Sequence, residues 1–446
     1  MLREPVGRLV AGLALPAICS MLVTSFYNMA DTFFVGQIST SATGAVGVSF
    51  GLMSLIQALG FFFGHGSGNY ISRQLGRGRV EDAKRMASLG FWLSFGFGLL
   101  LSALGLCLGE GLATVLGATP TILPHAMAYM RIILLGAPFM CASFNLNNQL
   151  RFQGNTVLGM VGIVCGAALN LALDPLFIFT FQMGVAGAAW ATLISQVVSF
   201  FVLLAGCMGK KSLGLSLRGA RPSRALCKEI AVGGLPSLLR QGFMAIGVVC
   251  LNQACRVAGD PQTVDAAIAA MGVVGKIVGF VFSVILGIGQ GFQPVCGFNY
   301  GAGRYNRVKK AYWLCVWISS GVLLVLCSVC FALAPTLIGL FRKDPAVVAI
   351  GATALRWQSV GMLLSGFTTM SNMMLQNIGK VVRASVLAVA RQGLFFVPLV
   401  LGLCAAFGLT GLFIAQPLAD FLSFASAMAM HLPVLGSLRE NAEEKM

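Results

Sequence analysis

Three carboxylates lie inside long apolar runs of the sequence: Asp31, Asp174 and Asp420. A charged side chain at the centre of a bilayer costs roughly 2.5–3.5 kcal/mol, so such residues are functional candidates by default. Tyr27 precedes Asp31 by four residues and Asn170 precedes Asp174 by four, so each pair shares one helix face. Burial and a second carboxylate nearby both favour the neutral acid. We therefore expect Asp31 and Asp174 to take up and release a proton near neutral pH.

Sodium is the alternative ion for the same residues. Carboxylate, amide and hydroxyl oxygens are ligands that hard cations prefer. A Na⁺ ion could bind at Asp31, Asn170 and Asp174, and Asn147 and Thr192 are expected to join the same interior. No other metal and no organic cofactor is expected, because the chain has only three histidines and they are scattered.

Each carboxylate also has a purely structural interpretation. Asp174 precedes Pro175 and could cap or kink its helix. Asp31 could form an ion pair with a basic residue such as Arg131. The sequence indicates no polar neighbours for Asp420, and its role stays open.

The elements that position these residues must be membrane helices. Of the 446 residues, 57% are apolar and only 10% are charged, whereas soluble domains carry about 25% charged residues. A spanning helix needs about 20 apolar residues, which leaves room for a dozen helices but not for a fused ATPase domain. An enzyme of the membrane would need His or acidic clusters at a membrane face, so we do not expect an enzyme. The sequence predicts an all-α membrane protein with twelve transmembrane helices, at residues 9–36, 44–72, 86–108, 121–145, 156–180, 185–208, 229–255, 264–296, 312–335, 346–375, 381–405 and 409–432.

The basic residues of the chain are concentrated at the termini and in alternate loops. The formal net charge is +16, yet 22 of the 30 basic residues lie at the two termini or after every second predicted helix. Basic loops stay on the cytoplasmic side of a membrane. The pattern predicts a multi-pass protein of the cytoplasmic membrane with both termini in the cytoplasm, and it argues against nucleic acid as a partner.

The chain contains an internal repeat. An offset of 225 residues aligns its two halves at glycines, prolines, arginines and asparagines, among them Gly78 with Gly303, Arg131 with Arg356, Asn147 with Asn372 and Gly154 with Gly379. Six helices per half make the repeats parallel, about an axis along the membrane normal. We expect a six-helix lobe at 1–208, a cytoplasmic linker at 209–228, a second lobe at 229–432 and a cytoplasmic tail at 433–446. Two such lobes facing a cleft suit transport by alternating access.

The halves differ in their charges. Arg240, Lys276 and Arg391 lie inside helices of the second half alone, where they could line a substrate cavity, snorkel to the interface or bind backbone carbonyls. Pro16 lies in the first helix, fifteen residues before Asp31, and a proline there permits a kink that could act as a hinge.

The chain resembles the multidrug and toxic compound extrusion (MATE) transporters along nearly its whole length. The resemblance rests on segments that occur in the family's order: Leu15-Pro16, Asp31-Thr32, Gly76-Arg77-Gly78, Ala83-Lys84, Asn170 to Pro175, Gly184-x-x-Gly187-Ala and Asn299-Tyr300-Gly301-Ala302. It implies two six-helix lobes in a V shape. It is closest to the DinF-like branch, whose cation site in the first lobe maps onto Tyr27, Asp31, Tyr129, Asn147, Asn170, Asp174 and Thr192, with Pro16 as the helix 1 proline.

The resemblance implies a secondary active efflux transporter that exchanges small amphipathic compounds for H⁺, with Na⁺ the less favoured ion. The alternative is a lipid-linked precursor flippase of the same superfamily, which would need a basic central cavity. The basic residues of the second half leave the charge of the substrate open. The expected partners are a small-molecule substrate and the lipid bilayer, and we expect a monomer.

The charge pattern makes a testable prediction about topology. Met1, Met446 and the loops near Arg79, Arg221 and Arg307 should all be cytoplasmic. A membrane-impermeant thiol reagent added to intact cells should leave single cysteines introduced at these positions unlabelled. Ready labelling near Arg221 would overturn the orientation.

Overall fold

The computed structural model describes residues 1–446 except 39, 210–211, 217–221, 259–263 and 439–446. The described part is helical and contains no strand. Eleven of its helices are long and apolar enough to cross a membrane, and one bent pair adds a twelfth span. The predicted all-α fold with twelve spans is confirmed. Arg221 and the last eight residues of the expected tail lie outside the described residues.

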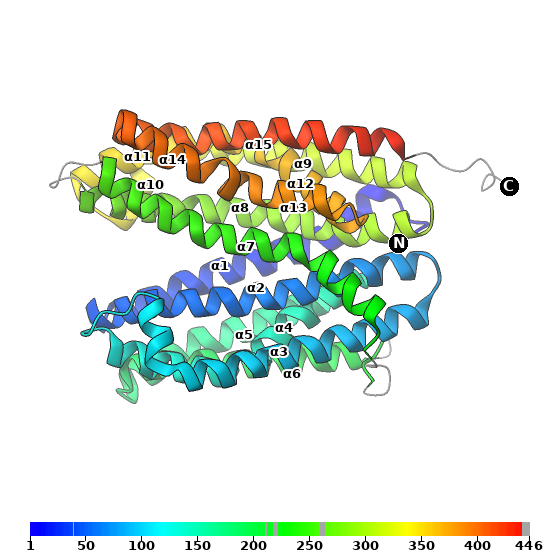
Figure 1. Ribbon diagram of the computed structural model, residues 1–446, viewed down its shortest axis with the longest axis horizontal. Coiled ribbons are helices and arrows are strands. Elements are labelled where there is room, and N and C mark those ends of the chain that lie inside the picture. Colours follow the sequence, from blue (N-terminus) through cyan, green and yellow to red (C-terminus); the bar gives the residue numbers. More distant parts are fainter. Residues whose placement is uncertain (39, 210–211, 217–221, 259–263, 439–446) are drawn as a thin grey trace. The chain divides into compact units, whose positions relative to one another are not determined.

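The helices follow the order of the predicted spans (Figure 1). The first six spans are α1 (Val6–Gly36), α2 (Thr40–Gly76), α3 (Val80–Val115), α4 (Leu123–Phe152), α5 (Thr156–Pro175) with the π-helical turn η1 (Leu176–Thr180), and α6 (Gly184–Met208). The second six are α7 (Arg224–Ala258), α8 (Val264–Gly301), α9 (Tyr305–Ala332) with the short α10 (Ala334–Phe341), α11 (Pro345–Met362) with α12 (Ser365–Asn377), α13 (Val381–Val389) with the π-helical turn η2 (Ala390–Leu394) and α14 (Phe396–Phe407), and α15 (Leu409–Ser437).

Several spans are broken or longer than their apolar runs. The tenth span bends by 51° between α11 and α12. The fifth and eleventh each contain a π-helical turn, which disturbs the regular helix and is often found at functional sites. Helix α3 begins at Val80 rather than 86, because helices continue past the lipid core into polar turns that hydropathy does not detect.

The chain forms two compact units that do not follow chain order completely. The first comprises Met1–Arg3 and Leu15–Leu238, and the second comprises Glu4–Ala14 and Leu239–Met446. The first turns of α1 therefore belong to the second unit, and the first turns of α7 belong to the first. The expected boundaries at 208 and 229 miss this exchange of helix ends.

Glycines allow the first turns of α1 and α7 to pack closely against the unit that each belongs to. In the first unit, a Cβ at Gly66 of α2 would collide with the backbone of Ile230 in α7. In the second unit, a Cβ at Gly291 of α8 would collide with the backbone of Ala14 in α1. Gly66 and Gly291 are related by the 225-residue offset, so each unit makes the same close contact with a helix end that the chain supplies from the other half.

The loops repeat the same backbone geometry in both units. Gly78 and Gly303 have φ angles of 76° and 74°, and Gly154 and Gly379 have φ angles of 91° and 83°. Glycine adopts this left-handed conformation without a steric penalty and commonly ends helices in it. The repeat found in the sequence is thus a repeat of helix ends as well as of residue types.

Helix α4 lies at the centre of the first unit. It contacts α2, α3, α5 and α6, and 67% of its spanning window is buried, against 28–39% in the other helices of that unit.

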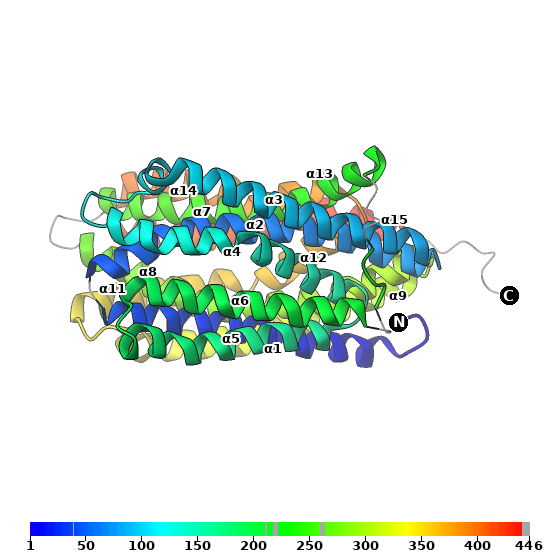
Figure 2. The same ribbon diagram turned by 90° about the horizontal axis from the view of Figure 1, so that it is seen from below.

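Helices α5 and α6 of the first unit lie next to each other in Figures 1 and 2 and also contact one another. In the second unit α14 and α15 pack together in the same way. Large apolar side chains such as Phe26, Trp317 and Leu340 are exposed, as lipid-facing residues are.

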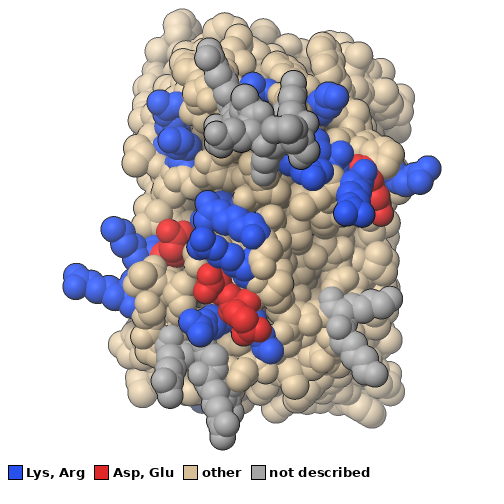
Figure 3. Space-filling view, turned by 90° about the vertical axis from the view of Figure 1, so that its right-hand side faces the viewer, with Lys and Arg blue, Asp and Glu red and all other residues tan. Residues whose placement is uncertain are grey.

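Basic side chains are visible on one face of the space-filling view. Figure 3 shows Lys and Arg side chains on the face that is turned to the viewer. The turns after α2 and α8 contain Arg79 and Arg304.

Replacing Gly66 with alanine should destabilise the protein by about 1–3 kcal/mol, because the added methyl group overlaps the α7 backbone. Gly96 of α3 is a matched control, since a Cβ added there would meet no atom within 4 Å. Gly96→Ala should leave stability unchanged or raise it by up to about 1 kcal/mol. Thermal unfolding in detergent measures both, and equal melting temperatures would contradict the close contact.

Candidate functional site

The first carboxylate of the site lies where α5 ends. Asp174 is fully buried and precedes Pro175 and the π-helical turn η1. The amide Nδ2 of Asn170 lies 3.4 Å from Asp174 Oδ1 and 3.5 Å from Thr192 Oγ1 of α6. The spacing of four residues therefore puts Asn170 and Asp174 on one face, as predicted, and that face meets α6.

Helix α1 brings the second carboxylate. Asp31 is 9% exposed, and the hydroxyl of Tyr27, one turn earlier, hydrogen-bonds with Gln196 of α6. Tyr129 of α4 is fully buried beside Thr192. Asp31 and Asp174 are close enough to interact electrostatically, and both tyrosines interact with both acids.

The structure thus gathers six of the predicted residues in one interior of the first unit. They are Tyr27, Asp31, Tyr129, Asn170, Asp174 and Thr192. They come from α1, α4, α5 and α6, which are far apart in the chain.

Two carboxylate oxygens of this cluster have no partner. Asp31 Oδ1 and Asp174 Oδ2 are buried and form no hydrogen bond with any described residue. Among the described residues, neither acid forms an ion pair. An unpaired buried carboxylate is strongly disfavoured as an anion, so these oxygens need a proton or a bound cation. A Na⁺ ion would find hard oxygen ligands here in the two carboxylates, the Asn170 amide and the Thr192 hydroxyl.

Neither a capping bond from Asp174 nor an ion pair between Asp31 and Arg131 is found among the described residues. Arg131 is exposed and makes no ion pair with Asp31. No side chain caps η1, and the described bond of Asp174 is to Asn170 rather than to the backbone.

The described contacts of Asn147 do not reach the cluster, and its part in ion coupling stays a prediction. Its Nδ2 donates to the carbonyl of Gly159 at 3.0 Å. Gly159 precedes Asp174 by fifteen residues on α5, which is roughly 22 Å along a helix. Asn372, the repeat equivalent, donates to the carbonyl of Ala384 at 2.6 Å. Both asparagines tie one helix to the next, and this structural role explains why the repeat preserves them.

Gln196 is a member of the cluster that the sequence analysis missed. It follows Thr192 by four residues, so the helix-face argument applied to α5 would have found it on α6.

Pro16 lies inside α1, which continues through it as a helix. It lies two residues beyond Ala14, the last residue of α1 that belongs to the second unit. Its role as a hinge stays a prediction.

The basic residues of the second unit are not gathered into one described cluster. Arg391 of η2 donates from Nε to Oδ1 of Asp420 at 2.7 Å, and Gln416 donates to the same oxygen at 3.0 Å. The expectation that Asp420 has no polar neighbours is therefore wrong. Gln416 lies four residues earlier on the same helix face, so the sequence could have predicted this contact. Arg240 is half-buried and Lys276 is exposed, and the described residues show no bond from either to Arg391.

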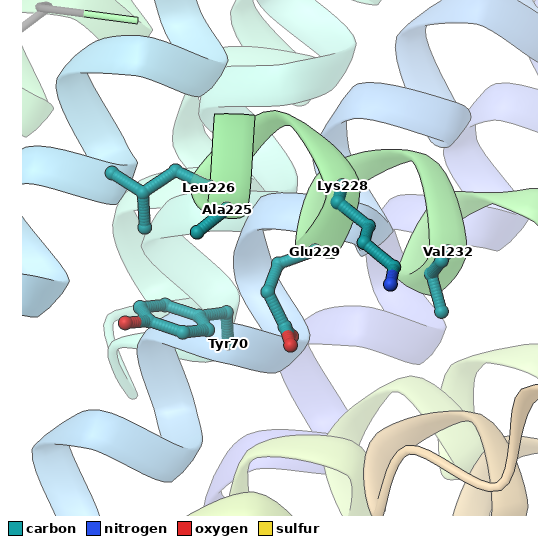
Figure 4. Close-up of a pocket in the computed structure, with 6 residues that line it drawn as sticks. All are labelled: Tyr70, Ala225, Leu226, Lys228, Glu229 and Val232. Atoms are coloured by element: carbon teal, nitrogen blue, oxygen red, sulfur yellow. The ribbon is translucent and has the colours of Figure 1, made fainter. Parts of the chain in front are cut away.

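A separate cavity of about 360 Å³ lies in the first unit between α2 and the first turns of α7 (Figure 4). It is lined by Tyr70, Ala225, Leu226, Lys228, Glu229 and Val232. Glu229 forms an ion pair of 3.1 Å with Arg73. None of the predicted site residues lines this cavity.

Comparison with known proteins gives a consistent result. The MatE family model matches residues 16–176 and 262–402. The multidrug export protein MepA of Staphylococcus aureus strain MRSA252 is 28% identical over 431 residues, which cover 96% of this chain and 93% of MepA. MepA of Staphylococcus haemolyticus is 27% identical over 417 residues, covering 92% and 90% of the two chains.

Solved structures resemble the fold over its full length. An outward-facing multidrug resistance MATE family transporter of the MOP superfamily superposes with a TM-score of 0.92. It is 27% identical, and the superposition covers 99% of this chain and 98% of that one.

The structural role of Asn147 can be tested against Asn170. Asn147→Ala should lower stability by about 1–3 kcal/mol, because a buried carbonyl loses its partner, and Asn372→Ala should do the same. Asn170→Ala should reduce ion coupling more than it reduces stability. Thermal unfolding and dye efflux from proteoliposomes separate the two effects. A coupling defect in Asn147→Ala at unchanged melting temperature would place it in the site.

Proposed function

Because the chain belongs to the MatE family of transporters, we propose that it exports small amphipathic compounds across the cytoplasmic membrane in exchange for protons. The family membership and the multi-pass membrane fold are established above. The ion, the direction and the substrate class are the proposal. Its relatives are named as multidrug exporters, which favours export over the flipping of lipid-linked precursors.

One observation carries the coupling proposal. Asp31 and Asp174 lie in one buried cluster and each keeps a carboxylate oxygen without a partner. Two neighbouring acids in such a place bind a proton when they are closed off and release it when water reaches them. Arginine or lysine at this site would neutralise the acids permanently, and neither is present in the described cluster.

The proposed cycle alternates between these two states. A proton enters at the outward-facing stage, neutralises one acid and allows α1 to rearrange about Pro16, which loosens the bound substrate. Hydration at the inward-facing stage draws the proton off. Since binding free energies are reciprocal, substrate binding should in turn favour proton release.

The energetics suit an exporter without ATP. A charge that crosses a potential of 100 mV releases about 2.3 kcal/mol. At about 1.4 kcal/mol per tenfold ratio, one coupled charge supports a concentration gradient of roughly 50-fold.

The site in the first unit agrees with the DinF-like branch, to which we assign the chain. The concentration of basic residues in alternate loops supports a cytoplasmic location for both termini. We propose a monomer that needs no cofactor, performs no catalysis and does not bind nucleic acid.

Asp31→Asn and Asp174→Asn should each abolish efflux driven by a proton gradient, because asparagine keeps the shape of the side chain but cannot titrate. Asp265→Asn is a matched control, since Asp265 is exposed in the first turn of α8. Dye efflux from proteoliposomes under an imposed pH gradient, and then under an imposed Na⁺ gradient, measures the effect. Wild-type rates in both site variants would rule out this site.

Substrate added to detergent-solubilised protein in weak buffer should release protons. The wild type should acidify the medium, and Asp174→Asn should acidify it much less. If no protons are released between about pH 5 and 8 and Na⁺ competes with the substrate instead, the coupling ion is sodium.

A further inference from the structure

The second unit contains a buried ion pair that the coupling proposal does not use. Arg391 and Asp420 meet at 2.7 Å, with their side chains 16% and 2% exposed. The guanidinium of Arg391 also lies over the ring of Phe282 of α8, 4.8 Å from its centroid. The arginine is thus held on two sides, by a carboxylate and by an aromatic face.

Helix packing alone does not require this pair. With the offset of 225, the first-unit counterpart of Arg391 is Gly166, which packs closely on Ser195 and Ser199 of α6. With the offset of 224 that relates Gly184 to Gly408, the counterpart of Asp420 is Gln196, and that of Gln416 is Thr192. The first unit therefore joins the same two helices with glycine and serine, and the second unit places an ion pair there.

The location corresponds to the coupling cluster of the first unit. Thr192 and Gln196 belong to that cluster, and Gln416 and Asp420 occupy their repeat positions in α15. The second unit thus has its own polar site at the pseudo-equivalent place, but the site contains a guanidinium that the first cluster lacks.

Most N–H groups of the Arg391 guanidinium have no acceptor in the described part of the chain. Only Nε of Arg391 is bonded within the described part of the chain, so the four N–H groups on Nη1 and Nη2 have no protein acceptor there. Polar groups inside a bilayer must find partners, and part of this side chain is exposed. Arginine presents such groups as a planar fork that matches a carboxylate or sulfonate.

The helix α7, which packs against the same turn, carries a second arginine. Phe243 and Gly247 of α7 pack against Gly393 and Gln392 of η2. Arg240 lies three residues before Phe243 and seven before Gly247, on the same face of α7. Among the described residues Arg240 forms no ion pair. Helix α7 therefore carries a further arginine on the face that packs against η2.

We propose that Arg391, held in place by Asp420 and Phe282, binds an acidic group, a carboxylate or sulfonate, of an amphipathic substrate. The inference rests on the proposed export function and names the substrate class of the second unit. Asp420 and Gln416 are positioning residues in this site, and Arg391 contacts the ligand.

Equilibrium dialysis of the detergent-solubilised protein tests the proposal without an ion gradient. The probes are dansyl-6-aminohexanoate and its uncharged methylamide, which differ only in the acidic group, with protein-free micelles as background. The wild type should bind the carboxylate at least tenfold more tightly than the amide. Arg391→Gln should remove the preference, and Asp420→Asn should weaken it because the guanidinium loses the carboxylate that holds it in place.

Arg356 is the matched control. It is exposed, lies over the ring of Phe331 at 5.8 Å and donates from Nε to the carbonyl of Phe331. Arg356→Gln removes the same charge and should keep the preference.

A double variant controls for the possibility that the single variants at Arg391 and Asp420 fold poorly. Removing one partner of a buried ion pair is costly, whereas replacing both is often neutral. The double variant Arg391→Gln with Asp420→Asn should therefore recover the wild-type melting temperature but not the preference. A preference that survives in the folded double variant, that is lost equally in Arg356→Gln, or that is absent from the wild type overturns the proposal. Since no gradient is used, failure of proton coupling would leave this result unaffected.

Discussion

An uncompensated charge is hard to keep inside a bilayer, and this constraint governs the polar interior of both units. The first unit brings Asp31 and Asp174 together without a basic partner, which leaves a proton or a cation as the only available compensation among the described groups. The second unit compensates Asp420 with Arg391. Among the described residues, the first unit therefore holds two acids without a basic partner, and the second holds an acid paired with an arginine.

The repeat explains how one architecture supports these two sites. The turns at Gly78 and Gly303, the bridges from Asn147 and Asn372, and the close contacts at Gly66 and Gly291 are the same in both halves. These features hold helices together. Asp31, Asp174, Arg240 and Arg391 lie at positions where the halves differ, so the two halves carry different chemistry on a shared pattern of helix contacts.

Breaks in the regular helix accompany both sites. Asp174 directly precedes η1, and Arg391 lies within η2. A π-helical turn is rare, occurs mostly as a single turn inside an α-helix and is frequently found at functional sites. At the equivalent contact in the first unit the regular helix has space for Gly166 only.

The sequence by itself determined the membrane fold, the number of spans, the repeat and the pairing of Tyr27 with Asp31 and of Asn170 with Asp174. These follow from hydropathy and from helix periodicity, which are local properties. Only the tertiary structure decided that Asn147 bridges helices, that Gln196 joins the cluster, that Asp420 pairs with Arg391 and that α1 and α7 each pass from one unit to the other. Each of these depends on which helices meet and at what height, and a contact between residues far apart in the chain leaves no periodic trace in the sequence.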